Sequence, residues 1–156
     1  MSTEKLQFLQ AGVAASIKDL DEKATARFGL MNAQQMLEHL ADFFEVSYEK
    51  IIFPLSVPEE HLPKYREFLY SDKQFRENTK APSGVLGDMP LPLRQASFAA
   101  ARQHLQGSVD QFIAYFRDEP AKKTLHPAFG YLNFDEWVLL HYKHVMHHLR
   151  QFDLVT

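Results

Sequence analysis

The stretch WVLLHYKHVMHHLRQF, residues 137–152, places four of the chain's eight histidines within eight positions. Apolar residues repeat through it at the spacing of one helix face, with Val138 and Val145 near the centre of that face. Asn133, just upstream, is a residue type that caps helix N-termini. The stretch therefore predicts a long amphipathic helix that begins after Asn133 and ends near residue 152.

The four histidines are not equivalent on this helix. At about 100° per residue, His141 and His148 lie within roughly 40° of the centre of the apolar face and His144 within roughly 80°, whereas His147 falls almost opposite. We therefore expect three histidines to face inward and His147 to face water. His144 and His148 are four residues apart, the spacing at which one helix offers two imidazoles to one ion. Val145 stands where the HExxH motif has glutamate, so a zinc-protease mechanism is not supported.

Helical spacing also predicts three other long helices, over about residues 3–21, 32–50 and 94–118. Asn32 is the expected cap of the second. Residues 53–93 differ, because they hold six of the eight prolines. They predict a long ordered connection, with a short helix over about 60–70, that covers the body of the protein.

Four amphipathic helices without an alternating strand pattern predict an all-α fold, a four-helix bundle. We expect residues 1–156 to form a single domain, with the long proline-rich connection between the second and third bundle helices.

Composition excludes several classes of function. The net charge is −3 and the pI is near 6.2, with scattered basic residues, so nucleic-acid binding is not expected. The absence of cysteine excludes disulfides, thiolate metal sites and a cysteine nucleophile. No signal peptide and no long apolar run is present, so we expect no membrane association and a cytoplasmic location. The many aromatic residues are compatible with a homodimer.

A third inward histidine comes from the second helix. His39 lies between Met36 and Phe43 on its apolar face, so it can meet His144 and His148 in the bundle core. Three neutral imidazoles buried together are either core polar residues with other partners or ligands of one ion. Three protein ligands and an open position are typical of catalytic zinc sites. No Glu-x-x-His motif occurs, which excludes the di-iron bundles.

These residues also carry a resemblance. His39 in "MLEHLADFF", with His144, His148 and Gln151 spaced as H-x3-H-x2-Q, resembles the DinB/YfiT-like superfamily of four-helix metalloenzymes. The stretch "HPAFG", residues 126–130, is similar to one branch with a His-Pro-x-Phe-Gly loop before the last helix. The resemblance covers nearly the whole chain.

The resemblance implies a DinB/YfiT-like bundle with one divalent ion held by His39, His144 and His148. Zinc or nickel is expected, with iron or manganese as alternatives. Because relatives include S-transferases and an isomerase that use small thiols, and hydrolases, it implies a small-molecule substrate and a low-molecular-weight thiol as cofactor. The alternative is a non-catalytic module that binds a metal or ligand or acts by dimerisation.

Several other residues are candidates at the site. His141 is an alternate ligand, a hydrogen-bond donor to a ligand, or a general base. Asp42, three residues after His39, is a candidate to orient a ligand or take up a proton. Gln151, one turn past His148, is a candidate hydrogen-bond partner of that ligand. The remaining histidines are expected to be solvated or structural, and they are His61, His104 and His126.

Overall fold

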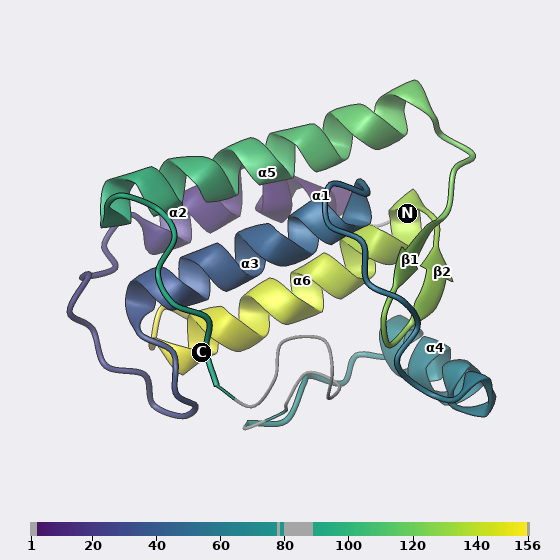
Figure 1. Cartoon of the computed structure of the whole chain (residues 1–156), viewed down its shortest axis with the longest axis horizontal. Coiled ribbons are helices and arrows are strands. Elements are labelled where there is room, and N and C mark those ends of the chain that lie inside the picture. The colour runs from purple at the N-terminus through teal and green to yellow at the C-terminus, as the bar shows by residue number, and fades with distance from the viewer. Residues whose placement is uncertain (1–2, 78, 80–88, 156) are drawn as a thin grey trace.

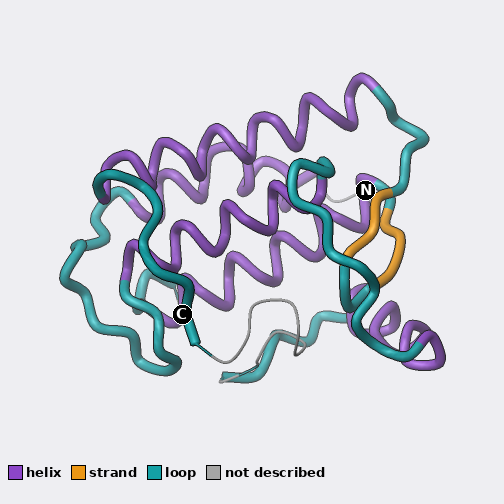
Figure 2. Tube along the Cα trace, viewed as in Figure 1, coloured by secondary structure: helices purple, strands orange, loops and turns teal. Residues whose placement is uncertain are grey.

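Helices make up most of the chain, and a small two-stranded sheet lies at one end of them (Figures 1 and 2). This computed structural model describes residues 3–77, 79 and 89–155. Residues 78 and 80–88 of the proline-rich connection, with Pro82, lie outside the described residues. Within the described ranges, no helix is both long and apolar enough to cross a membrane.

Three helical segments follow one another at the N-terminus. Helix α1 covers Thr3–Gln7, a π-helical turn covers Phe8–Gly12, and α2 covers Val13–Ile17. Leu9, Val13 and Ile17 are buried from this region. The helix predicted over residues 3–21 is therefore shorter and carries a π-helical turn.

Two helices that supply the histidines begin with reciprocal side-chain caps. Helix α3 spans Ala33–Ser47 and α6 spans Phe134–Gln151. The side chain of Asn32 accepts from the Gln35 backbone N–H, and the Gln35 side chain accepts from the Asn32 backbone N–H. Asn133 and Glu136 make the same pair of hydrogen bonds. Both caps were predicted correctly, because Asn side chains satisfy N–H groups that a helix start leaves unpaired.

Helix α5, Phe98–Asp118, packs along α3, and α3 packs in turn against α6 (Figure 1). Its cap is Ser97, whose hydroxyl accepts from the Ala100 N–H, so the helix begins four residues later than expected. Upstream of this cap, the backbone N–H groups of Arg94 and Gln95 donate to the Glu38 carboxylate, so this stretch is attached to α3 before α5 begins.

The connection between α3 and α5 contains helix α4, Leu62–Tyr70, preceded by a 3-10 turn over Glu59–His61. Arg66 and Tyr70 both donate to the buried carboxylate of Glu136 on α6. Lys143 on α6 donates from Nζ to the Ser71 carbonyl oxygen at 2.7 Å. The described part of this segment is therefore fixed to α6.

The expectation of a purely helical fold was wrong at residues 124–132. Strand β1, Thr124–His126, pairs antiparallel with β2, Gly130–Leu132. Three-residue strands are too short to show an alternating pattern, which is why the segment looked like a loop. The hairpin is tied to the helices by Thr124, whose hydroxyl donates to the Ser47 carbonyl oxygen and accepts from Trp137 Nε1.

Candidate metal centre

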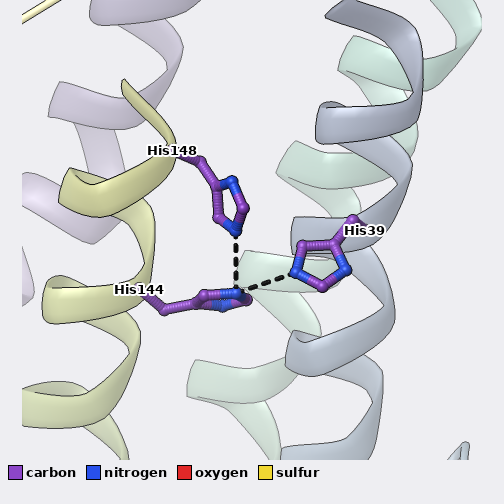
Figure 3. Close-up of side chains that lie close together, drawn as sticks. All are labelled: His39, His144 and His148. Carbon is purple, nitrogen blue, oxygen red and sulfur yellow. Dashed lines mark hydrogen bonds between the residues drawn. The ribbon is translucent and has the colours of Figure 1, made fainter. Parts of the chain in front are cut away.

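Three histidines from two helices meet at one point between α3 and α6 (Figure 3). His39 comes from the middle of α3, and His144 and His148 come from successive turns of α6. The Nε2 atom of His144 lies 2.9 Å from that of His39 and 3.2 Å from that of His148. One nitrogen from each ring lies within 4.8 Å of the other two.

Where the three Nε2 atoms meet, there are more nitrogen lone pairs than hydrogens to pair with them. His148 donates its Nδ1–H to Gln151 Oε1 at 2.8 Å, so its neutral ring has a lone pair on Nε2. The Nε2 atom of His144 faces this lone pair and Nε2 of His39 at once. A single hydrogen can bridge only one of these two pairs. A divalent cation accepts all three lone pairs, so the donor set fits such an ion.

Gln151 fixes the orientation of His148. Its Nε2 donates to the Phe28 carbonyl oxygen at 2.8 Å, while its Oε1 accepts from His148. Gly29 makes room for this amide, because a Cβ added there would lie 2.6 Å from Gln151 Nε2. Its φ of +77° is a backbone conformation that also favours glycine. The loop after α2 therefore takes part in positioning a ligand candidate on α6.

Burial keeps the three imidazoles neutral. Together with smaller effects of His147 and Arg94, it lowers the pKa of His39 to about 4. It also lowers the pKa values of His144 and His148 well below the ordinary histidine range, and the neighbouring histidines add to the effect. Unprotonated nitrogens are what a metal ion requires of histidine.

A cavity of about 1030 Å³ opens beside the three nitrogens. Helix α4 and the segment after it supply part of its wall, including Tyr65, Phe68 and Phe75. Phe43, Phe129 and Trp137 supply aromatic surface on the side of α3, the hairpin and α6. Such a cavity, mostly apolar with a few convergent polar groups, is the usual form of a small-molecule site.

Asp42 also lines the cavity, but it is paired. Its two carboxylate oxygens accept from the two terminal nitrogens of Arg94 at 2.9 and 2.7 Å. Burial raises the pKa of Asp42, and the Arg94 guanidinium opposes that effect. The carboxylate therefore forms an ion pair at the cavity wall, one turn along α3 from His39.

His141 lies deeper in the core than the three converging histidines. It is 1% exposed and stacks on Phe44 at 3.9 Å and on Trp137 at 5.1 Å between ring centroids. It is not among the three residues whose nitrogens converge. Burial lowers its pKa well below the ordinary range, which makes it a weak proton acceptor near neutral pH.

The expectation that His147 faces water was wrong. Its side chain is 6% exposed and packs against Phe28 and Phe75, with ring centroids 5.3 and 5.8 Å away. The helical wheel treats the side opposite the bundle core as solvent. Here the loop before α3 and the segment after α4 cover that side of α6.

Arg94 and His126 are polar residues of the cavity wall that were not predicted to lie there. Glu38 and Asp42, one turn apart on a largely buried helix, were the available signal that a cation from elsewhere must pair with α3. No helical pattern surrounds His126 in the sequence, so nothing there indicates which way its side chain points. Of the other two histidines expected to be solvated or structural, His61 is exposed and His104 pairs with Glu45.

A family model described as the DinB superfamily matches residues 4–152. No curated protein matches the chain, and no solved structure does.

Proposed function

The chain belongs to the DinB superfamily, and on that premise we propose that it is a metal-dependent enzyme whose divalent ion is held by His39, His144 and His148. The observation that carries the proposal is the convergence of one nitrogen from each of these residues within 4.8 Å, beside a cavity that the same residues line. The family match supports the resemblance seen in the sequence.

We also propose that the helical segments form the four-helix bundle of this family. The segment from α1 to α2 and the helices α3, α5 and α6 would be its four members, and the connection that contains α4 would be its long insertion. Contacts of α3 with α5 and α6, and of the N-terminal segment with α5 and α6, support this arrangement.

A divalent ion bound by three neutral imidazoles supplies Lewis acidity, which lowers the pKa of a bound water or thiol. The protein's own residues would bind and orient the reactants. Gln151 holds the His148 ring in place, and Phe75 packs against His144 and limits access of water from that side. The aromatic wall would hold the apolar part of a small molecule.

The reaction we propose is transfer to or from a low-molecular-weight thiol, an S-transferase activity, or hydrolysis of a small molecule. Zinc or nickel is the proposed ion, with iron or manganese as alternatives, since imidazole nitrogens bind all four. A cavity of about 1030 Å³ is large enough for a thiol and a second small reactant together.

Metal content tests the site. Untagged protein stripped of metal is incubated with zinc, nickel, manganese or iron(II), desalted and measured by mass spectrometry. We expect one ion per chain in the wild type and none in His39→Ala, while His61→Ala, at an exposed histidine, keeps the ion. No ion in the wild type with any metal, or equal binding by His39→Ala, would refute the proposed site.

Activity is tested separately on the loaded protein. Low-molecular-weight thiols are offered with chlorodinitrobenzene, and nitrophenyl esters are offered without thiol. We expect a rate in one of these assays that disappears in His39→Ala and persists in His61→Ala. A loaded protein that is inactive in every assay would be a metal-binding module without this catalysis.

A further inference from the structure

We infer that His126 is a ligand-binding residue, whose Nε2–H donates a hydrogen bond to an acceptor oxygen of the small molecule in the cavity. The inference deepens the proposed function and rests on it, because that molecule is the one that reaches the metal centre. It assigns the molecule a chemical class: a carbonyl or carboxylate oxygen attached to an apolar body.

The tautomer of His126 follows from its loop. The backbone N–H groups of Ala128 and Phe129 both donate to Nδ1, at 2.9 and 3.2 Å. A neutral imidazole has one nitrogen that donates and one that accepts. Because Nδ1 accepts, the hydrogen is on Nε2. The tight turn between β1 and β2 thus converts His126 into a fixed hydrogen-bond donor.

This donor has no acceptor within the described part of the protein. The side chain is 8% exposed, and no described residue accepts a hydrogen bond from its Nε2. Its ring is surrounded by aromatic rings, with centroids 5.6 Å from Phe43, 5.2 Å from Phe129 and 5.6 Å from Trp137. Polar N–H groups in such surroundings require a partner, and His126 lines the cavity from which one can come.

Phe43 links this donor to the metal centre. Its ring centroid lies 5.6 Å from that of His126 and 5.3 Å from those of both His39 and His144. The donor and the converging nitrogens are therefore on adjacent parts of one cavity wall. A molecule of modest length can reach both, with its apolar part against Phe43 and the exposed side chains of Leu30, Met89 and Leu91 at the rim.

His126 is suited to binding rather than to proton transfer. Burial lowers its pKa to about 3, so the ring stays neutral at physiological pH. Protonation would also require a hydrogen on Nδ1, where two backbone N–H groups already point. A neutral imidazole donor stabilises negative charge on an oxygen without exchanging its proton.

The first experiment measures the tautomer directly. Long-range nitrogen–proton NMR spectra of metal-free protein are expected to show His126 with hydrogen on Nε2 and none on Nδ1. Addition of propionate, a simple carboxylate probe, is expected to shift the Nε2 resonance. A hydrogen on Nδ1, or no response of Nε2 to propionate, overturns the inference, and neither result depends on bound metal.

The second experiment uses a variant that keeps the loop. In His126→Asn, the side-chain oxygen can replace Nδ1 as acceptor for the loop N–H groups, while the donor at the Nε2 position is lost. Zinc-loaded wild type and variant are titrated calorimetrically with mercaptocarboxylates of increasing length and with alkanethiols of matched length. We expect at least one mercaptocarboxylate to bind the wild type roughly tenfold more tightly than its alkanethiol, and this preference to vanish in the variant.

Equal affinities in the wild type, or a preference that survives in His126→Asn, overturn the inference. The alkanethiols report the metal centre alone, so they are expected to bind both proteins equally. Zinc content of each sample is measured before and after titration. A wild type that holds no zinc refutes the metal site, and the propionate response then decides the role of His126 by itself.

Discussion

At the scale of single residues, two adjacent histidines on α6 differ in the direction of their side chains. His147 and His148 are adjacent and similarly buried, at 6% and 5% exposed. Only His148 directs a nitrogen toward His39 and His144. The ring of His147 packs instead between Phe28 and Phe75. Burial therefore does not distinguish a ligand candidate from a packing residue, whereas direction does.

This difference gives a matched pair of variants. We expect His148→Ala to abolish metal binding and His147→Ala to retain one ion per chain, because only the first removes a converging nitrogen. His147→Ala also removes a packed ring, so some loss of thermal stability is expected. Metal content by mass spectrometry and thermal unfolding of both variants check this. Equal metal loss in the two would contradict the geometry.

Gln151 offers a second prediction at this scale. Gln151→Leu removes the acceptor for His148 Nδ1–H and is expected to weaken metal affinity by roughly 10- to 100-fold. Gln151→Glu keeps an acceptor oxygen and is expected to retain most of the affinity, although it loses the hydrogen bond to Phe28. Competition with a chromogenic chelator measures both. Unchanged affinity in Gln151→Leu would show that packing alone orients His148.

At the scale of elements, the first turn of α6 connects a helix cap to helix α4. Asn133 and Glu136 close the first turn of the helix with two reciprocal hydrogen bonds. Glu136 also accepts from Arg66 and Tyr70, so the same turn anchors α4. A residue that caps α6, Glu136, therefore also holds α4, which forms part of the cavity wall.

The cap of α6 can be tested without touching the site. We expect Asn133→Ala to lower the free energy of unfolding by about 1 kcal/mol, since it leaves the backbone N–H of Glu136 in the first turn without its acceptor. Asn133→Ser should retain most of the stability, because serine is also a good cap. Urea denaturation of the three proteins measures the difference. A change within error for Asn133→Ala would mean that tertiary packing alone fixes the start of the helix.

At the scale of the whole molecule, the fold encloses several neutral histidines, and this makes its stability sensitive to acid. Burial lowers the pKa of His39 to about 4 and that of His126 to about 3. In an unfolded chain the pKa of histidine is about 6.5. Below that value the unfolded state binds more protons than the folded state, so acid favours unfolding.

We therefore expect the stability of the metal-free protein to be fully present above about pH 6.5 and to fall as the pH drops toward 4, by about 1.4 kcal/mol per pH unit for each such histidine. Urea denaturation at a series of pH values measures this. His126→Asn should show a shallower decline, because one of the buried histidines is gone. Stability that stays constant down to about pH 4.5 would contradict the pKa values of these groups.

Much of the helical framework was predictable, because its signals are local. Asn32 and Asn133 mark the starts of α3 and α6, and the apolar spacing around His39 and His148 predicts the inward faces of those helices. The hairpin at Thr124–His126 and Gly130–Leu132 was not predictable in this way. It depends on Thr124 meeting Ser47 and Trp137, contacts that no local pattern contains.

The sequence by itself determined which face of each helix would turn inward and that His39, His144 and His148 lie on those faces, because helical periodicity fixes direction within each element. Only the tertiary structure decided the surroundings of those imidazoles. The burial of His147 under Phe75, the pairing of Asp42 with Arg94 and the fixed donor at His126 all depend on segments distant in sequence. The spacing within one helix sets the direction of a side chain, but its neighbours come from the rest of the chain.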